Sequence, residues 1–205
     1  MRSIIMPNSR FSALASRNWA NAVVYTIGHS TRTQAELTAL LRHYGVATLV
    51  DVRIIPRSHH NPQFNQEELA RALPAAGIAY AHLPRLGGLR RGLGAASPND
   101  GWRNASFRAY ADYMQTADFA HGLEELQSLT HAGPIAIMCA EAVPWRCHRS
   151  LIADALTIRG VAVREIRSLT RTEAHKLTPF ARVDGLHITY PAVDGAATEE
   201  RRSIE

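Results

Sequence analysis

The stretch that decides the fold is "PIAIMCAEAVPWRCHRSLIADALTIRGVAVREI", residues 134–166. It opens with a short apolar run, 134–140, which is typical of a buried strand. Residues 148–160 then predict a helix that ends at a glycine, and residues 161–166 predict another strand. A strand, a helix and a strand in this order predict two parallel strands joined by a crossover helix.

The same alternation runs through the chain before this stretch. Strands are predicted at 22–30, 46–53 and 78–84, and helices at 31–45 and 66–77, with one or two more helices in 106–133. The pattern predicts a single α/β domain with a mostly parallel sheet of about five strands and helices on both faces. After it, Asp184 and Gly185 separate two β-prone runs within 179–191, which predicts a small C-terminal β-hairpin extension.

We therefore expect an α/β domain over 21–170 and the hairpin extension over 171–193. Residues 1–20 suggest a flexible N-terminal extension without the apolar core of a secretory signal, and residues 194–205 a disordered tail. No apolar run approaches the roughly 18 residues that a membrane helix needs. Two cysteines in 205 residues do not make a disulfide scaffold, so a reducing, cytoplasmic location is expected.

The chain is basic, with a net charge of +5, and its basic residues are almost all arginine. Arginine is a good ligand for phosphate. The charge therefore permits a small anionic substrate or a nucleic acid as partner, without proving either. The glycine-rich segment at 84–94 has neither of the common nucleotide-binding patterns.

Unusual residues follow each predicted strand. Ligands of open α/β sheets bind beyond the carboxyl ends of the strands, so these loops predict a site at one edge of the sheet. The loops hold Gly28, His29 and Ser30; Asp51, Arg53 and Ser58; the glycine-rich segment 84–94; and Cys139, Glu141, Arg146, Cys147, His148 and Arg149.

Two of these groups also have structural interpretations. Ser30 or Thr31 could cap the helix that follows. Asp51 lies inside an apolar run, where a buried carboxylate must be paired, so a structural pair with Arg53 and a catalytic role are both open.

The cysteine loop allows four interpretations. Cys139 at a strand exit would face backbone N–H groups and a helix N-terminus, which lower a thiol pKa. Cysteine phosphatases and sulfurtransferases use such loops, but with C-x5-R spacing, whereas Cys139 and Arg146 form C-x6-R. Cys139, Glu141, Cys147 and His148 suit zinc or iron by type, although not by spacing. A Cys139–Cys147 redox pair and inert buried thiols are the other two interpretations.

Several ordered motifs resemble a bacterial and archaeal family, domain-of-unknown-function family 488 (DUF488). They are "TIGHS" (26–30), "LVDVR" with "PRS" (49–58), "LGG" (86–88), "MCAE" (138–141) and "CHR" (147–149), and Pro62 and Phe64 add a further match. The resemblance spans 23–168, and "LTPFARVDG" (177–185) resembles the C-terminal extension of one branch. It implies a compact α/β domain with its signature residues in loops after strands, and it implies no settled activity.

Together these observations predict an enzyme acting on a small anionic substrate, phosphorylated or nucleotide-like, with Cys139 as a reactive or substrate-contacting thiol. The rival interpretation is a non-catalytic module that binds nucleic acid or another anion. No cofactor is predicted outside the zinc or iron alternative. The candidate catalytic residues are Cys139, Glu141, His29 and Asp51, and the candidate substrate-binding residues are Arg53, Ser30, Ser58, Arg146, Arg149 and His148.

Overall fold

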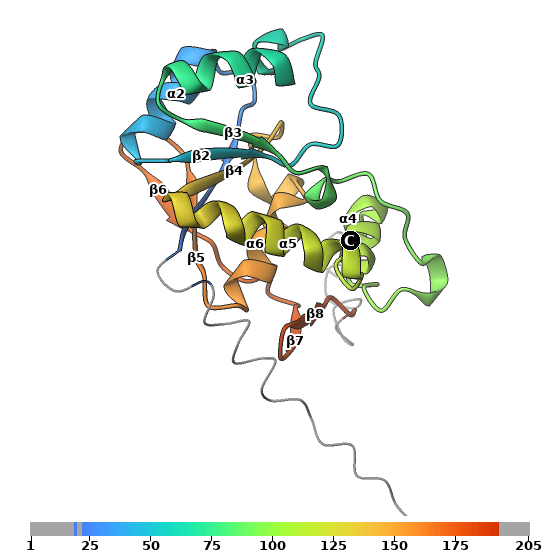
Figure 1. Ribbon diagram of the computed structural model, residues 1–205. Coiled ribbons are helices and arrows are strands. Elements are labelled where there is room, and N and C mark those ends of the chain that lie inside the picture. The colour runs from blue at the N-terminus through green and yellow to red at the C-terminus, as the bar shows by residue number, and fades with distance from the viewer. Residues whose placement is uncertain (1–18, 20–21, 193–205) are drawn as a thin grey trace, which may run out of the picture.

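The computed structural model describes residue 19 and residues 22–192, and its core is a six-stranded sheet (Figure 1). The expected extension at 1–20, Trp19 apart, and the expected tail at 194–205 lie outside the described residues. The sheet contains β1 (Val23–Gly28), β2 (Thr48–Asp51), β3 (Ala79–His82), β4 (Ile135–Cys139), β5 (Ala162–Ile166) and β6 (Thr172–Ala174). The helices are α2 (Gln34–His43), α3 (Gln66–Ala75), α4 (Ala105–Tyr113), α5 (Ala117–Leu129) and α6 (Arg149–Thr157).

The strand order is β3-β2-β4-β1-β5-β6. The first five strands are parallel, as predicted, and β6 pairs with β5 in the antiparallel direction at one edge. The chain runs outward from β1 to β2 and β3, and it then returns so that β4 lies between β1 and β2. Parallel pairing brings the carboxyl ends of β1, β2 and β4 to one edge of the sheet, where ligands of such sheets bind.

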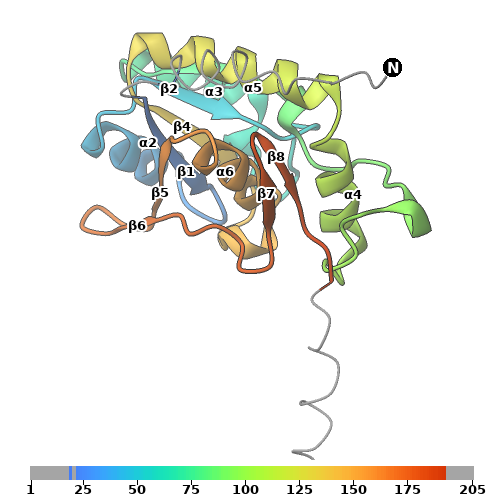
Figure 2. The same ribbon diagram turned by 90° about the horizontal axis from the view of Figure 1, so that it is seen from below.

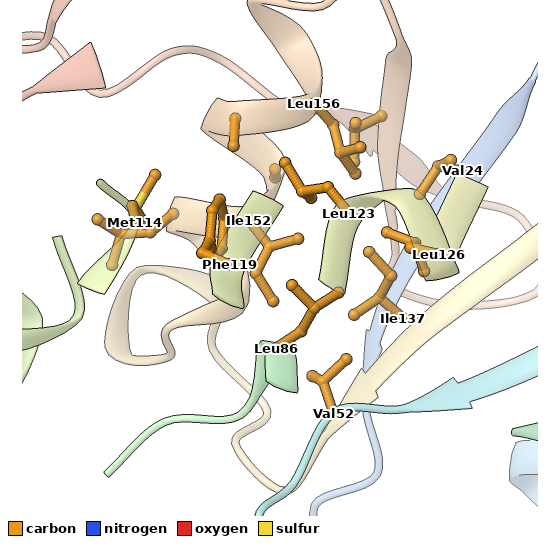
Figure 3. Packing of buried hydrophobic residues seen from close by; sticks show 14 of the residues in the cluster. Val24, Val52, Leu86, Met114, Phe119, Leu123, Leu126, Ile137, Ile152 and Leu156 are labelled. Atoms are coloured by element: carbon orange, nitrogen blue, oxygen red, sulfur yellow. The ribbon is translucent and has the colours of Figure 1, made fainter. Parts of the chain in front are cut away.

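Helices cover both faces of the sheet, which confirms the predicted architecture (Figures 1 and 2). Successive residues of β4 point to opposite faces, because side chains alternate along a strand. Ile135 and Ile137 pack with α5 and α6, while Ala136 and Met138 pack with α2 and α3. Figure 3 shows the larger of the two cores, where Ile137 lies among side chains of α5, α6 and the loops after β2 and β3.

Local sequence explains where the helices begin. Thr33, rather than the expected Ser30 or Thr31, caps α2: its side chain accepts a hydrogen bond from Glu36 N, and Glu36 bonds back to the Thr33 backbone. The segment 106–133 forms two helices rather than one, because Thr116 caps a new helix by accepting from Phe119 N.

The predicted hairpin consists of β7 (Arg182–Asp184) and β8 (His187–Thr189), and Gly185 in its turn has a φ of 58°. Tyr190, directly after it, is fully buried; its hydroxyl donates to Asp154 of α6 at 2.9 Å, and its backbone N–H donates to Asn99 at 2.9 Å. The extension is therefore packed on the α/β body. Among the described residues, no helix has the length and apolar character needed to cross a membrane.

Candidate active site at the carboxyl edge of the sheet

Cys139 ends β4, between the ends of β1 and β2. Gly28 of β1 is its register partner, and Asp51 of β2 is the register partner of Met138. The loops after β1 and β4 then continue side by side: His29 N donates to Cys139 O, and Ser30 N donates to Ala140 O, both at 2.9 Å. The strand order thus brings three of the predicted loops together.

Gly28 is needed for this close approach. A Cβ atom at this position would lie 1.8 Å from the carbonyl oxygen of Glu141 and 2.9 Å from Cα of Ala142. No side chain other than hydrogen fits, so the glycine allows the loop after Cys139 to lie directly against β1.

Arg149 also holds this loop, through its carbonyl oxygens. Its side chain is fully buried, donates to the Glu141 carbonyl at 2.5 Å and to the Ala142 carbonyl at 3.2 Å, and forms an ion pair with Glu165 of β5 at 3.0 Å. Thr26 of β1 donates a further hydrogen bond to Glu165. Arg149 was predicted to bind substrate; in the structure its side chain contacts two carbonyls of the loop and the Glu165 carboxylate.

Cys139, Cys147 and His148 form a compact cluster. One sulfur or ring nitrogen from each lies within 4.8 Å of the others, and Cys147 Sγ is 3.8 Å from His148 Nδ1. Glu141, the fourth residue of the predicted metal set, is not in this group, and its side chain is exposed.

The contacts within the cluster shift the pKa values of the two thiols in opposite directions. The hydrogen bond from Cys147 lowers the pKa of Cys139 far below the usual thiol range; burial opposes this, and the His148 ring and the Glu141 backbone N–H add to it. The same Cys139–Cys147 hydrogen bond, together with burial, raises the pKa of Cys147. The two shifts favour the deprotonated form at Cys139 and the protonated form at Cys147.

Asp51 and Arg53 form the buried pair that the sequence had left open. Arg53 donates to the Asp51 carboxylate through Nε at 2.9 Å and through a terminal nitrogen at 2.5 Å, and Tyr80 donates its hydroxyl to the same carboxylate at 2.9 Å. Burial works against the charge of Arg53, but Asp51 outweighs it, so the pKa of Arg53 is raised. Asp51 thus fixes the position of Arg53.

His29 lies next to Arg53. Its ring stacks on Phe64 with centroids 4.2 Å apart, its Nε2 is 3.3 Å from Arg53, and its Nδ1 is 2.9 Å from the carbonyl of Ser30. Burial lowers the pKa of His29, which keeps the ring neutral near pH 7.

Two adjacent cavities open over these residues. One has a volume of about 440 Å³ and contains the cysteine cluster; its walls are Arg53, Ile54, Ile55, Gly88, Leu89, Ser106, Phe107, Tyr110, Cys139, Ala140, Glu141, Arg146, Cys147 and His148. The other has a volume of about 360 Å³ and includes Arg53, Glu141, His29, Ser30 and Ser58. Eight of the ten predicted site residues therefore line one cavity or the other; Asp51 and Arg149 lie behind the walls.

A larger cavity than either, of about 670 Å³, lies between α6 and the segment 173–180, and neither cysteine lines it. Cavity volume alone therefore does not identify the cavity that contains the cysteine cluster.

Sequence reasoning missed the wall that comes from α4. Tyr110 is fully buried, its ring centroid lies 5.0 Å from that of His148, and its hydroxyl donates to the Leu86 carbonyl at 2.7 Å. The "LGG" motif was the available signal for this side. A Cβ at Gly88 would lie 3.1 Å from His148 Nδ1, so the glycine lets the loop pack against the histidine.

The cysteine loop differs from a phosphatase loop in one decisive respect. The backbone N–H groups of Arg146 and Cys147 donate within the loop, to the carbonyls of Val143 and Pro144, where they close a 3₁₀ turn over Pro144–Arg146. They do not face a common centre as the donors of a phosphate cradle do.

Comparison with known protein families gives a match over most of the chain. The family model "Domain of unknown function DUF488" matches residues 33–156, which is well over half of the chain. No curated protein and no solved structure matches. The match includes β2, β4 and the whole cysteine loop, and it agrees with the resemblance carried by the sequence motifs. This chain belongs to the DUF488 family.

Proposed function

We propose that this protein is an enzyme in which the Cys139 thiolate attacks an electrophilic centre of a small anionic substrate. The observation that supports this most directly is the pair of cysteines, with pKa values shifted in opposite directions, in the lining of the 440 Å³ cavity. A thiolate is the nucleophilic form of cysteine, and a low pKa in a partly open cleft is a feature of catalytic thiols.

The proposed step is a displacement with water as the final acceptor. The Cys139 sulfur forms a bond to the electrophilic atom, and the bond to the leaving group breaks with its electron pair. In this proposal the ring of His148 passes a proton to the leaving group. Water then attacks the same atom, the bond to sulfur breaks to restore the thiolate, and the proton of water returns to His148.

Two arginines suit the anionic part of the substrate. Arg53 reaches the cavity in a fixed position because Asp51 holds it. Arg146 is exposed at the same cavity, without an acidic side chain in ion-pair range among the described residues. Arg149 and Asp51 act in this proposal as positioning residues, and Ser30 and Ser58 belong to the adjoining cavity. A cytoplasmic location is part of the proposal, because two neighbouring reduced thiols suit a reducing compartment.

The pH dependence of alkylation tests the thiolate. Between pH 8 and pH 5 an ordinary thiol loses about tenfold in rate per pH unit, since its pKa of about 8.5 leaves ever less thiolate. Because the folded pKa of Cys139 is lowered, its rate with iodoacetamide should stay level over this range and fall only in stronger acid. Mass spectrometry separates the two thiols, because trypsin cleavage after Arg146 puts Cys139 in peptide 109–146 and Cys147 in peptide 147–149.

Two variants serve as controls for that experiment. Cys147→Ala removes the main donor to Cys139 and should restore a pH-dependent rate, whereas Cys147→Ser keeps a hydroxyl donor and should change the profile less. A wild-type rate that follows pH as glutathione does would refute the proposed nucleophile.

The cluster also supports a second candidate function, a zinc-dependent site. Two sulfurs and an imidazole nitrogen within 4.8 Å provide three ligands, and catalytic zinc sites use three protein ligands and leave one position open. Here the open position would face the cavity.

Zinc can be tested without knowing the reaction. Untagged protein prepared without chelator should contain about one zinc per chain if the site is a metal site. Adding a strong chelator should then speed the alkylation of Cys139, because metal-bound thiolate reacts slowly. Metal-free protein whose melting temperature does not respond to added zinc would eliminate this candidate.

A further inference from the structure

Two exposed apolar side chains lie at the cavity that holds Cys139. Ile55, in the loop after β2, is 66% exposed, and Leu89, in the loop after β3, is 83% exposed. They come from separate parts of the chain and line the same cavity. Exposed apolar groups gathered at a cleft mark a binding surface, whereas scattered ones do not.

Leu89 is also held in an unfavourable backbone conformation. Its φ is 57°, in the left-handed region that non-glycine residues with a Cβ avoid. Such strain persists where the surroundings fix it, and it concentrates at functional sites. A glycine at this position would satisfy the backbone, so the leucine side chain is kept at a cost in stability.

Hydrogen bonds from Arg90 hold the backbone on the N-terminal side of Leu89 in place. Arg90 donates through Nε to the Gly87 carbonyl at 2.9 Å and through its terminal nitrogen to the carbonyls of Pro84 and Arg85 at 2.7 Å each. Its guanidinium also lies over the ring of Tyr113, 3.8 Å from the centroid. Gly87 leaves no room for a Cβ, which would lie 2.4 Å from Ile54. These contacts hold the glycine-rich loop in one conformation, with Leu89 at the edge of the cavity.

The cavity walls continue this apolar character inward. Phe107 and Tyr110 of α4 and Ile54 of the loop after β2 line the same cavity as the cysteine cluster. Tyr110 uses its hydroxyl on the Leu86 carbonyl, so it offers the cavity its ring. Arg53 and Arg146 supply positive charge beside these walls.

From this arrangement, and resting on the proposed thiol chemistry, we infer that the substrate carries its anionic group on a flat aromatic or heteroaromatic ring. The ring lies between Ile55 and Leu89 and against Phe107, and the anion meets the arginines. A bare inorganic anion would leave the apolar rim unused. A cavity of about 440 Å³ suits a ligand of one ring with its substituents.

Alkylating probes of matched chemistry test the substrate class. In each probe the Cys139 sulfur displaces iodide, a C–S bond forms as the C–I bond breaks, and iodide leaves with the electron pair. The probes are iodoacetamide, iodoacetate, N-phenyl iodoacetamide and 4-(iodoacetamido)benzoate, each rate being divided by the rate of the same probe with glutathione. The benzoate probe, which has both ring and anion, should saturate and react at least tenfold faster than iodoacetamide, with smaller gains for the probes that have only one feature.

Rim variants identify the source of the gain. Ile55→Ser and Leu89→Ser should each remove most of the gain in rate that the benzoate probe shows over iodoacetamide with the same variant. Leu89→Gly should remove it while keeping or raising the melting temperature, because glycine relieves the strain; this separates lost binding from lost folding. Leu93→Ser is the matched control, since Leu93 is 61% exposed in the same loop but does not line the cavity, and it should retain the gain.

The outcomes distinguish the two proposals. If iodoacetamide reacts with a level pH profile but the benzoate probe gains nothing, or gains equally in the rim variants, the substrate class is wrong and the thiol chemistry stands. If Cys139 follows pH as an ordinary thiol does, the thiol chemistry fails, and the inference that rests on it fails as well.

Discussion

Gly28→Ala should abolish the unusual reactivity of Cys139 and lower the free energy of unfolding by about 3 kcal/mol or more, beyond the usual cost of overpacking. The added Cβ would lie 1.8 Å from the Glu141 carbonyl oxygen and 2.6 Å from its carbon. Both neighbours are backbone atoms, so no side chain can rotate away. The loop after β4 must move, and with it the Glu141 N–H that lowers the pKa of Cys139.

Two measurements test the prediction for Gly28→Ala. Urea unfolding should show the loss of stability, and the rate of Cys139 alkylation should fall from pH 8 to pH 5 as that of an ordinary thiol does. Gly160→Ala is the matched control: Gly160 has a φ of 78° and nothing within 4 Å of an added Cβ, so alanine is strained there but displaces no neighbour. It should cost about 1 kcal/mol and leave the pH profile level. A Gly28→Ala protein with both properties intact would show that the loop does not depend on this approach.

The fold was largely predictable because its central strands are short apolar runs between helical segments. All five residues of β4 are buried, as a central parallel strand requires. In a parallel sheet the carboxyl ends of the strands lie at one edge, so the parallel pairing also predicts which loops meet there. The edge strand β6 could not be predicted in this way, because its three residues, Thr-Glu-Ala, are partly exposed and have no apolar pattern.

The roles within the site were less predictable, because they depend on contacts between distant segments. Spacing showed that Arg149 lies near the start of a helix, but its direction is set by Glu165, which β5 presents from the far side of β1. Tyr110 lies in an ordinary amphipathic helix, and only the packing of α4 brings its ring to His148. Asp51 was more accessible to sequence reasoning, since a carboxylate within an apolar run requires a nearby partner and Arg53 is two residues away.

The second large expected effect, on the free energy of unfolding, comes from the buried ion pair between Arg149 and Glu165. Glu165→Gln should lower the free energy of unfolding by about 3–5 kcal/mol, because it leaves the guanidinium of Arg149 buried without a countercharge. Arg149 is fully buried and Glu165 is 6% exposed, so water cannot replace the missing charge without opening the structure. Urea unfolding measures the loss. The exposed pair Arg71 and Glu68 is the control, since Glu68→Gln should change stability by less than about 1 kcal/mol.

The double variant Arg149→Met with Glu165→Leu separates stability from site geometry. Removing both charges takes away the uncompensated one, so much of the lost stability should return. The carbonyls of Glu141 and Ala142 nevertheless lose their donor, and the loop that presents the Glu141 N–H to Cys139 loses its support. The alkylation rate of Cys139 should therefore stay pH-dependent in a protein that is again stable. A double variant that recovers the level pH profile along with its stability would show that Arg149 serves the fold alone; one that recovers only stability assigns it the task of holding the cysteine loop in place.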